Sequence, residues 1–536
     1  MPTNADRIIR MLKDVGVQRL FGMPGGGSNA DLIQAAGDAG LPFSLAHGEA
    51  ASAFMAGAQA EITGTPGACL ATLGPGTASL TNGAAHASLD RVPLILLTDC
   101  YSPSTAAVMQ HQCLQHRDIF RSLVKCSEQL SCDKTVHQLQ RAFEVVSSLP
   151  PGPVHLDVSH EVVSQSISAE ENAPSRPTLG ALAPPKPIPE EIQRIICGAR
   201  RPVFLVGLGA RTKTVASAVR SACERFAIPA LVTYKAKGVV PDRHPWFGGI
   251  FTNGALERKV LERADIFLTV GLDTVELLPV PWTLIQPVVS ITSWPMSQTQ
   301  VPAIIELVGD IAAGLHAVTE LLPERSAWIE EELLQMVEFQ RQCMRVGNEE
   351  NALLPHRVVE MVADAYPGVR ATVDAGAHMF PVMSLWPADE PCGVLVSNGL
   401  ATMGFAVPAA IGAAFLDTSR PTLAFTGDGG LLMCLGELRT AARENLPLRI
   451  IVFDDGELSL IKIKQLRRGY RPDGVTIGEI DWRAVGTGLG VLAMQADNEK
   501  TLRDCLADTR WHTGPVLIAA KVSARTYQDT IRAVRG

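Results

Sequence analysis

The amino-acid sequence predicts an α/β protein whose domains are Rossmann-like, doubly wound parallel sheets. Residues 421–426 form a predicted strand that ends in glycines, and a predicted helix over 431–444 leads to a second strand over 448–453. Residues 201–209 and 264–271 are further apolar runs that end in glycine. Short apolar runs of this kind, separated by helices, are typical of βαβ units, which build parallel sheets.

Chain length and two changes of composition divide the sequence into three domains. The 536 residues exceed what one hydrophobic core usually organises. A stretch rich in proline, serine and alanine predicts an exposed linker, and a charged helical stretch predicts a second connection. The predicted parts are an N-terminal domain (1–165), a linker (166–188), a central domain (189–320), a helical linker (321–350) and a C-terminal domain (351–536).

Composition and charge exclude several classes of protein. The net charge of −8 and the absence of a dense Lys/Arg cluster argue against a nucleic-acid partner. Apolar runs such as 406–415 are too short to form the roughly 18–20-residue span that a membrane requires. Mixed charges over residues 6–13 argue against a secretory signal and favour the cytoplasm. The 11 cysteines are scattered, which indicates neither a disulfide framework nor a zinc site.

The strand ends of the C-terminal βαβ unit carry acidic residues. Asp428 lies among residues 427–430, which follow the first strand, and Asp454 and Asp455 follow the second. Ligands of parallel sheets gather at the carboxyl ends of the strands, so we expect two carboxylates to face one divalent cation. Glycines let the backbone approach phosphate oxygens, and the N–H groups at a helix start donate to them. The motif therefore predicts a site for a magnesium-bound diphosphate.

This motif resembles the cofactor fingerprint of the thiamine diphosphate (ThDP) enzymes, in which Gly-Asp-Gly is followed at this distance by paired asparagines. The chain has Asp454-Asp455 where most of that family has Asn-Asn. The resemblance implies that Mg²⁺ is bound by Asp428, Asp455 and the main-chain carbonyl of Glu457. An aspartate ligand at this position adds negative charge to the metal site.

The N-terminal domain carries a second group of residues that match the family. Glu49 begins a helix of small residues, at the place of the family's glutamate that hydrogen-bonds the aminopyrimidine ring and promotes removal of the C2 proton. Residues 21–26 resemble the family's glycine loop, and residues 72–97 resemble the pyrimidine-domain signature of acetolactate synthases. His111 and Gln112 fall where the family keeps substrate-facing residues.

Two further segments resemble elements of the family's diphosphate domain. His378 takes the place of a residue that hydrogen-bonds the diphosphate, and Met403 takes the place of the apolar wedge that keeps ThDP bent. The implied catalytic residues are Glu49, Gln112 and His111. The implied cofactor contacts are Pro24, Gly25, Gly26, Gly76, Asn82, His378, Asn398, Gly399, Leu400, Met403, Gly427, Gly429 and Gly430.

The resemblance also sets expectations for the central domain and the assembly. Residues 207–209 hold two glycines but no complete GxGxxG, so no motif supports a dinucleotide, although some acetolactate synthases hold FAD in this domain. In the family, the N-terminal domain of one chain and the C-terminal domain of another share each cofactor. We therefore expect a homodimer or homotetramer with shared active sites. The pattern assigns no role to His47 or His86.

The resemblance covers nearly the whole chain and is greatest to acetolactate synthase large subunits. It implies a transferase or lyase that uses ThDP and Mg²⁺ to decarboxylate a 2-oxo acid, pyruvate by default, and to transfer the acyl unit to a second carbonyl. His111 replaces an aromatic residue of the biosynthetic enzymes, which leaves open a benzaldehyde-lyase-like enzyme or a simple decarboxylase acting on a bulkier 2-oxo acid or aldehyde. A third alternative, motivated by Asp454-Asp455, is a catalytically silent paralogue.

Overall fold

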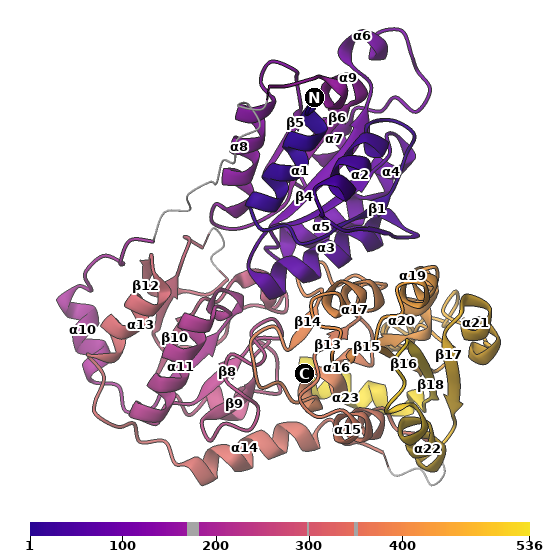
Figure 1. Ribbon diagram of the computed structural model, residues 1–536. Helices are drawn as coiled ribbons and strands as arrows, with labels where there is room; N and C mark the ends of the chain where they lie inside the picture. The colour runs from indigo at the N-terminus through magenta and orange to yellow at the C-terminus, as the bar shows by residue number, and fades with distance from the viewer. Residues whose placement is uncertain (169–181, 297–299, 348–351) are drawn as a thin grey trace.

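The computed structural model describes residues 1–168, 182–296, 300–347 and 352–536. They form three α/β lobes, each built on its own six-stranded parallel sheet, which confirms the predicted fold class (Figure 1). One sheet falls within each predicted domain, while the domain boundaries stay predictions. Most of the predicted linker 166–188 and the end of the helical linker 321–350 lie outside the described residues.

The N-terminal domain has the strand order β2-β1-β3-β4-β6-β5. Its strands are β1 (Leu20–Met23), β2 (Phe43–Leu45), β3 (Gly67–Ala71), β4 (Leu94–Cys100), β5 (Cys126–Gln129) and β6 (Val154–Ser159). Its helices are α1 (Asn4–Asp14), α2 (Ser28–Asp38), α3 (Glu49–Thr63), α4 (Pro75–Ser79), α5 (Thr81–Leu89), α6 (Pro103–Ala106), α7 (His116–Phe120), α8 (Thr135–Ser147) and α9 (His160–Ser164).

The central domain has the order β12-β11-β10-β7-β8-β9, which is the doubly wound order of dinucleotide-binding folds. Its strands are β7 (Pro202–Val206), β8 (Ala230–Val232), β9 (Phe247–Ile250), β10 (Ile266–Val270), β11 (Val288–Thr292) and β12 (Ala303–Val308). Its helices are α10 (Glu190–Cys197), α11 (Lys213–Phe226), α12 (Arg258–Leu261) and α13 (Ile311–Thr319), with the short 3₁₀ helices η1 (Leu208–Ala210) and η2 (Thr274–Glu276); α14 (Glu330–Gln342) follows.

The C-terminal domain has the order β14-β13-β15-β16-β18-β17. Its strands are β13 (Ala371–Val373), β14 (Val394–Val396), β15 (Thr422–Gly427), β16 (Leu448–Asp454), β17 (Leu492–Ala496) and β18 (Val516–Lys521). Its helices are α15 (Pro355–Ala365), α16 (Met379–Leu385), α17 (Ala406–Ala414), α18 (Asp428–Met433), α19 (Glu437–Arg443), α20 (Ser459–Arg467), α21 (Trp482–Leu489), α22 (Glu499–Thr509), η3 (Ala524–Thr526) and α23 (Tyr527–Arg535).

The structure differs from the sequence prediction between β15 and β16. The single helix expected over 431–444 is two helices, α18 and α19, separated by residues 434–436. A Cβ added at Gly436 would lie 2.8 Å from the Cβ of His47, so the break brings the chain directly against the N-terminal domain. Helix α19 can therefore begin at that surface, which an unbroken helix along the sheet would not meet.

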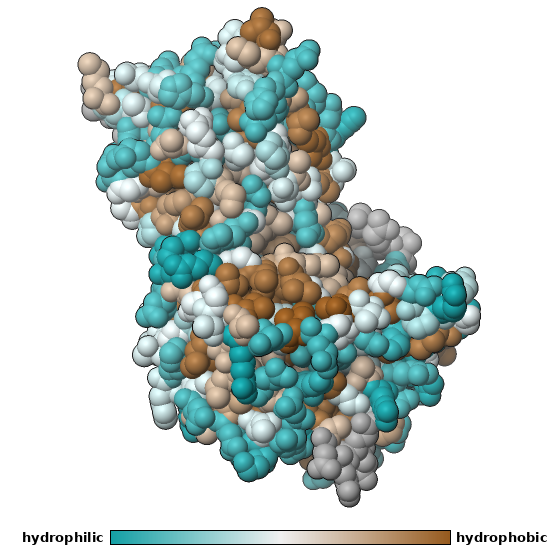
Figure 2. All heavy atoms as spheres, turned by 90° about the vertical axis from the view of Figure 1, so that its right-hand side faces the viewer, coloured by the Kyte–Doolittle hydropathy of each residue, from teal (hydrophilic) through white to brown (hydrophobic). Residues whose placement is uncertain are grey.

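The N-terminal and C-terminal domains dock through two helices made largely of small residues. Helices α3 and α17 pack so closely that a Cβ on Gly412 would lie 2.2 Å from the carbonyl oxygen of Met55. Gln59 Nε2 donates to the Gly412 carbonyl across this contact (3.1 Å). Figure 2 shows apolar side chains gathered where the upper lobe meets the lower one. No helix within the described residues is long and apolar enough to cross a membrane.

Candidate functional site

The two predicted metal-binding carboxylates lie at the ends of adjacent parallel strands. Strands β15 and β16 pair with Gly427 opposite Phe453, so Asp428 and Asp455 follow at the same edge of the sheet. Asp428 accepts the N–H groups of Gly429 and Gly456, both at 2.7 Å. Asp455 accepts the Glu457 N–H (3.0 Å) and the Ser459 hydroxyl (2.7 Å). These bonds fix both carboxylates, and each oxygen keeps a lone pair for a cation.

The acidic pair is electrostatically uncompensated. Burial raises the pKa of Asp428 to about 6, and Asp454 adds to the rise. Burial raises the pKa of Asp455 to about 7, with a further contribution from Asp428. A divalent cation between them would relieve both effects, and carboxylate oxygens are ligands that Mg²⁺ prefers.

Glu457 is suited to bind a cation through its backbone. Lys462 Nζ donates to both Glu457 carboxylate oxygens, at 2.6 and 2.7 Å, so the side-chain charge is already matched. Within the described part of the chain, the Glu457 carbonyl accepts no hydrogen bond. The donor set of two carboxylates and one carbonyl therefore fits Mg²⁺.

His378 places an unpartnered nitrogen beside the Gly-Asp-Gly turn. Its ring stacks on Phe453, with centroids 5.2 Å apart, and a Cβ on Gly427 would lie 3.4 Å from His378 Nδ1. Nε2 is buried without a hydrogen-bond partner among the described residues. Burial lowers the pKa of His378 to about 4, while a bond to the Phe425 carbonyl opposes the shift. A phosphate oxygen at Nε2 would favour the protonated ring, so a diphosphate fits this nitrogen.

Met403 lies over the same turn. A Cβ on Gly429 would lie 3.3 Å from Met403 Cε, so the side chain reaches the glycine from the opposite segment. Met403 also lines a cavity of about 590 Å³ between the N-terminal and C-terminal domains, together with His47, Asn82 and Met433. Asn82 Nδ2 donates to Thr402 Oγ1 (3.2 Å) at this boundary.

Asp374, which the sequence did not single out, holds the Met403 segment in place. Its carboxylate accepts the N–H groups of Phe405 and Ala406, both at 2.7 Å, and that of Gly404 at 3.2 Å. It also accepts the Thr426 hydroxyl at 2.6 Å. A Cβ on Gly430 would lie 2.4 Å from Asp374 Oδ2, so this turn requires glycine there. The sequence signal that could have identified Asp374 is its position directly after the strand β13.

The predicted N-terminal site residues also come together. Glu49 begins α3, and a Cβ on Gly76 would lie 3.3 Å from Glu49 Oε1. A Cβ on Gly25 would lie 2.1 Å from Thr72 Oγ1, so the turn of residues 24–26 packs on the same segment. Gly26 faces open space. The Glu49 carboxylate, Gly25 and Gly76 thus surround one surface at the ends of β1 and β3.

His111 and Gln112 occupy an exposed segment beside that surface. Gln112 has a positive φ of 58°, and a Cβ on Gly74 would lie 2.8 Å from the Gln112 carbonyl oxygen. Gln112 lines a cavity of about 810 Å³ in the N-terminal domain. His111 does not line it, and its carbonyl accepts the Tyr101 hydroxyl at 3.1 Å. Gln112 thus contacts Gly74 of the turn that approaches Glu49, whereas His111 contacts Tyr101.

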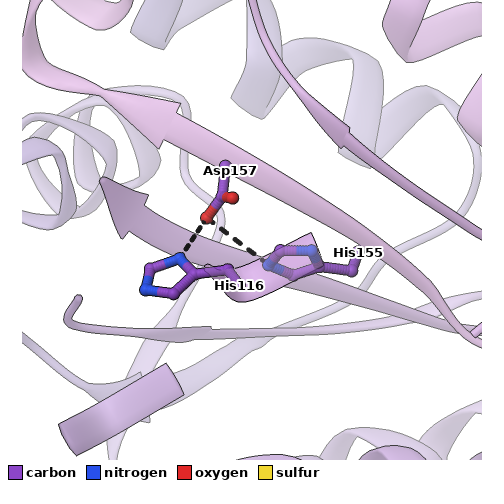
Figure 3. Close-up of side chains that lie close together, drawn as sticks. All are labelled: His116, His155 and Asp157. Atoms are coloured by element: carbon purple, nitrogen blue, oxygen red, sulfur yellow. Dashed lines mark hydrogen bonds and ion pairs between the residues drawn. The ribbon is translucent and has the colours of Figure 1, made fainter. Parts of the chain in front are cut away.

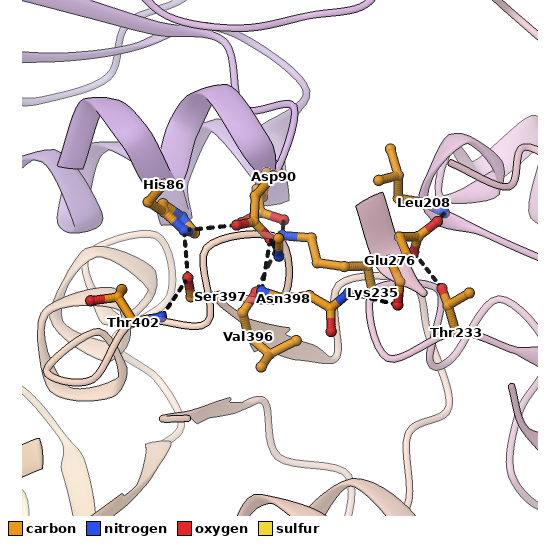
Figure 4. Close-up of polar contacts among 12 residues, drawn as sticks. His86, Asp90, Leu208, Thr233, Lys235, Glu276, Val396, Ser397, Asn398 and Thr402 are labelled. Atoms are coloured by element: carbon orange, nitrogen blue, oxygen red, sulfur yellow. Dashed lines mark hydrogen bonds and ion pairs between the residues drawn. The ribbon is translucent and has the colours of Figure 1, made fainter. Parts of the chain in front are cut away.

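Asn398 lies at a junction of all three domains (Figure 4), and Gly399 directly follows it. Asp90 accepts their N–H groups at 2.9 and 3.3 Å, and Asn398 Nδ2 donates to the Glu276 carbonyl at 3.0 Å. Lys235 Nζ lies 3.2 Å from Asp90. These two amides already have partners in this chain, so their cofactor contact, like that of the half-buried Leu400, stays a prediction.

Buried charged side chains connect the three domains at that junction. Lys235 also pairs with Glu61 at 2.6 Å, and His86 Nδ1 lies 3.1 Å from Asp90 and 3.0 Å from Ser397 Oγ. Although burial acts in the opposite direction, Lys235 and His86 hold the pKa of Asp90 well below its usual range. Breaking one partner of such a buried network leaves an unpaired charge, which is strongly destabilising. His86 thus has a structural role that its sequence position did not indicate.

Glu437 anchors the segment before Glu49. Its Oε1 accepts the His47 N–H at 2.9 Å, and its Oε2 accepts the Thr440 hydroxyl at 2.8 Å. His47 Nδ1 also lies 2.9 Å from Thr440 Oγ1. Helix α19 of the C-terminal domain therefore orients the chain that enters α3. The sequence did not indicate this contact, because its pattern predicted one continuous helix over 431–444.

The glycine loop of the central domain does not offer a phosphate site. The Leu208 N–H donates to Glu276 Oε2 at 2.9 Å, and a Cβ on Gly207 would lie 2.6 Å from the same oxygen. Burial raises the pKa of Glu276 to about 7. A dinucleotide needs these N–H groups for its pyrophosphate, and the protein's own carboxyl takes one of them. The residues present do not fit FAD at this loop.

Within the described chain, Glu49 makes no polar contact with the predicted metal ligands, although Asn82 of the N-terminal domain contacts Thr402 beside Met403. Among the described residues, no hydrogen bond or ion pair joins Glu49 to Asp428, Asp455 or Met403. One group can hold a metal and an anion, and the other presents a carboxyl next to a glycine-lined surface. A ligand that contacts both groups would have to reach from the metal-binding residues of the C-terminal domain to the surface around Glu49.

Comparison with known proteins matches all three domains. Family models described as the thiamine pyrophosphate enzyme N-terminal TPP binding domain, central domain and C-terminal TPP binding domain match residues 2–120, 190–318 and 374–520. The chain is 29% identical to "Acetolactate synthase" of Bacillus subtilis (strain 168), covering 98% of this chain and 94% of that protein. It is 28% identical to "Acetolactate synthase, catabolic" of Raoultella terrigena (97% and 95%) and 26% identical to "Acetolactate synthase isozyme 1 large subunit" of Escherichia coli (strain K12) (97% and 94%).

Proposed function

Because the chain belongs to the thiamine pyrophosphate enzymes, we propose that it uses ThDP and Mg²⁺ to decarboxylate a 2-oxo acid, by default pyruvate, and to transfer the acyl unit to a second carbonyl. The observation that carries the proposal is the pair of buried carboxylates at adjacent strand ends, beside the unpartnered nitrogen of His378. A divalent cation and a diphosphate together satisfy all three groups. The presence of Glu49, Asp428 and Asp455 argues against the silent paralogue.

The C-terminal residues would bind and orient the cofactor. Asp428, Asp455 and the Glu457 carbonyl would hold Mg²⁺, and His378 would take a diphosphate oxygen. Glycines 427, 429 and 430 would let the backbone approach the phosphates closely, and the turn itself requires glycine at 430, where a Cβ would lie 2.4 Å from Asp374 Oδ2. Met403, held by the Asp374 network, would support the cofactor from below. When bound, ThDP supplies a nucleophilic carbon that adds to a carbonyl and an electron sink that permits loss of CO₂.

Glu49 would supply the acid–base function. A carboxyl that hydrogen-bonds the aminopyrimidine exchanges a proton with it, and proton transfer by a positioned side chain typically contributes about 10²–10⁴-fold in rate. Glycines 25 and 76 keep the surface around this carboxyl free of side chains. Gln112, at the neighbouring cavity, would contact the substrate, and His111 would lie at its entrance.

The two groups of residues would meet between two copies of the chain. This is supported by the absence of a hydrogen bond or ion pair between Glu49 and the metal ligands within the described chain, and by exposed apolar side chains such as Met433, which is 67% exposed beside the interdomain cavity. We infer a homodimer or a dimer of dimers. Size-exclusion chromatography with light scattering tests the inference, and an active monomer would overturn it.

A second candidate function is favoured by the size of one cavity. The space of about 810 Å³ beside Gln112 exceeds what pyruvate fills and lies within the range that larger ligands occupy. An enzyme acting on a bulkier 2-oxo acid or an aromatic aldehyde, without a second pyruvate, would use that space.

The deciding experiment is an acid-quenched incubation of the protein with ThDP, Mg²⁺ and pyruvate, analysed by NMR. Acetolactate is the expected product. Acetaldehyde without acetolactate would instead indicate a simple decarboxylase. If pyruvate is not consumed while an aromatic 2-oxo acid is, the second candidate replaces the first. Failure to bind ThDP in the presence of Mg²⁺ would refute the proposal itself.

A further inference from the structure

Three buried polar side chains of the N-terminal domain, His116, His155 and Asp157, lie close together (Figure 3). His116 begins α7, and His155 and Asp157 lie in β6; the three are 5%, 0% and 9% exposed. His116 Nδ1 lies 2.6 Å from Asp157 Oδ1, and His155 Nε2 lies 3.5 Å from the same oxygen. Within the described residues, this is the one group of three side chains placed closely enough to bind a metal ion.

The hydrogen bonds explain the group without a metal. Hydrogen bonds from His116 and His155 outweigh burial and hold the pKa of Asp157 well below its usual range, so its carboxylate only accepts. Thr98 Oγ1 donates to Asp157 at 2.6 Å, so at its 2.6 Å contact with His155 Nε2 it can only accept. His155 Nδ1 meets the Ser127 hydroxyl at 2.8 Å. Asp157 Oδ1 and both ring nitrogens of His116 and His155 have protein partners, and a metal ion would displace several of these bonds.

His116 connects this group of side chains to the turn that approaches Glu49. The Gly74 N–H donates to His116 Nε2 at 3.4 Å, which requires the proton of the neutral ring to be on Nδ1, facing Asp157. Gly74 has φ +66° and ψ −106°, a conformation that favours glycine. The same turn approaches Gln112 at Gly74 and Glu49 at Gly76, as the short distances to added Cβ atoms show.

We propose that His116, oriented by Asp157, is a positioning residue that fixes the turn of residues 72–76 and, through it, the Glu49 carboxyl and Gln112. This rests on the proposed function only for the role of Glu49. Asp157 selects the ring tautomer and orientation, as a carboxylate does for a histidine whose other nitrogen must accept. His116 and Asp157 also line the cavity beside Gln112, but this assignment gives His116 no part in bond making or proton transfer. Its effect is on geometry, to which proton transfer is sensitive.

The first test uses the cofactor-free protein. We would compare the parent with His116→Phe, which keeps a ring but loses both nitrogens, and with His116→Gln, whose Oε1 can accept from Gly74. Amide hydrogen exchange of the peptide covering residues 72–80, followed by mass spectrometry, should be roughly threefold to tenfold faster in His116→Phe and partly restored in His116→Gln. The control is His137→Phe, at an exposed histidine of α8, which should match the parent.

The second test measures deuterium exchange at C2 of ThDP bound with Mg²⁺, without substrate. His116→Phe should bind ThDP and exchange roughly tenfold to a hundredfold more slowly than the parent. If His116→Phe does not fold, Asp157→Asn, which keeps the histidine but not the fixed tautomer, should show the same two changes to a smaller degree.

Three outcomes would overturn the inference. Unchanged amide exchange in a folded His116→Phe variant would show that His116 does not hold the turn. Faster amide exchange with unchanged C2 exchange would show that the turn does not position Glu49. Stoichiometric zinc in the purified parent, lost in His116→Phe, would make the group a metal site. A parent that does not exchange C2 at all refutes the proposed function, and the amide exchange then alone decides whether His116 holds the turn.

Discussion

In the N-terminal domain the strands lie in the order β2-β1-β3-β4-β6-β5, and the C-terminal domain repeats this order with β14-β13-β15-β16-β18-β17. The equivalent strands β2 and β14 are each followed by a segment that leads into a small-residue helix, α3 or α17, and these two helices pack on each other. The equivalent strands β3 and β15 each end in a glycine-rich turn. The two halves of the candidate site are therefore built at equivalent places of one topology.

The difference between the two domains lies in the residues placed on that common frame. The turn after β15 carries Asp428, and the next strand leads to Asp455, so an anion and its cation can bind there. The turn after β3 carries Gly76 beside Glu49, and the next strand ends at Cys100. Topology fixes where a ligand can bind, and side-chain chemistry decides whether the place holds a metal or moves a proton.

The largest effect is expected from removing a metal ligand in the C-terminal half of the candidate site. Asp428→Asn should lower the affinity for Mg²⁺ by roughly 100-fold or more and abolish detectable turnover, because the amide cannot replace the anionic ligand. Calorimetric titration of ThDP at fixed Mg²⁺ measures the loss. Asp473→Asn, at a residue whose side chain is 76% exposed and remote in role, is the charge-matched control. Equal Mg²⁺ affinity in Asp428→Asn and the parent would remove Asp428 from the metal site.

Removing the proposed acid–base group, Glu49, should leave ThDP binding intact. Glu49→Gln should fold and bind ThDP with near-parental affinity, while kcat falls by about 10²–10⁴-fold, the usual contribution of a positioned acid or base. Exchange of the C2 proton, followed by quenched NMR, isolates the step. Parental exchange in Glu49→Gln would assign the proton transfer to another group.

Mixing the two inactive variants tests whether the halves meet across subunits. After dissociation and reassociation of equal amounts of Asp428→Asn and Glu49→Gln, half of the dimers are mixed, and each mixed dimer holds one intact site. About a quarter of the parental activity should return. If both halves of a site came from one chain, mixing would restore nothing.

A smaller effect is expected for Met403, which lies over the metal turn without binding a charged group. Met403→Ala should retain cofactor binding and lower kcat by roughly tenfold, because the support beneath the cofactor is lost. Met403→Leu, with similar volume, should restore most of the rate. Steady-state kinetics decides, and unchanged turnover in Met403→Ala would refute the wedge role.

The sequence predicted those parts of the site that lie directly at strand ends. Asp428 and Asp455 could be placed because apolar runs identify strands, and parallel strands end at one edge. Asp374 was equally accessible, since it directly follows β13, yet it binds backbone N–H groups more than thirty residues away, as in its bond to Ala406. Such a partner is set by tertiary packing, which local pattern does not contain.

Other contacts left no local signal. His116 and Asp157 are 41 residues apart in sequence and meet only because the fold brings the start of α7 to the strand β6. Glu437 reaches His47 because the helix breaks at residues 434–436, whereas its apolar pattern predicted one continuous helix. Buried polar networks depend on the whole fold, so they are the part of a site that sequence reasoning misses first.

The smallest expected effect concerns the free-energy cost of placing Asp428 and Asp455 close together when no cation is bound. Asp428 and Asp455 have folded pKa values of about 6 and about 7, above the value near 4 of an unfolded aspartate. A carboxyl whose pKa is raised by folding binds its proton more tightly in the folded state. It therefore lowers stability progressively as pH rises from about 4 to about 7, and the full penalty persists above that window.

The metal-free protein should consequently lose more stability than Asp455→Asn between pH 5 and pH 8. The difference in Tm between the two proteins should grow by on the order of a few degrees over this range, and Mg²⁺ should remove most of it by neutralising the pair. Thermal unfolding at several pH values, with and without Mg²⁺, measures both effects, and Asp473→Asn again serves as the control. A pH-independent difference would mean that solvent already compensates the pair, and the C-terminal half would then need no cation to be stable.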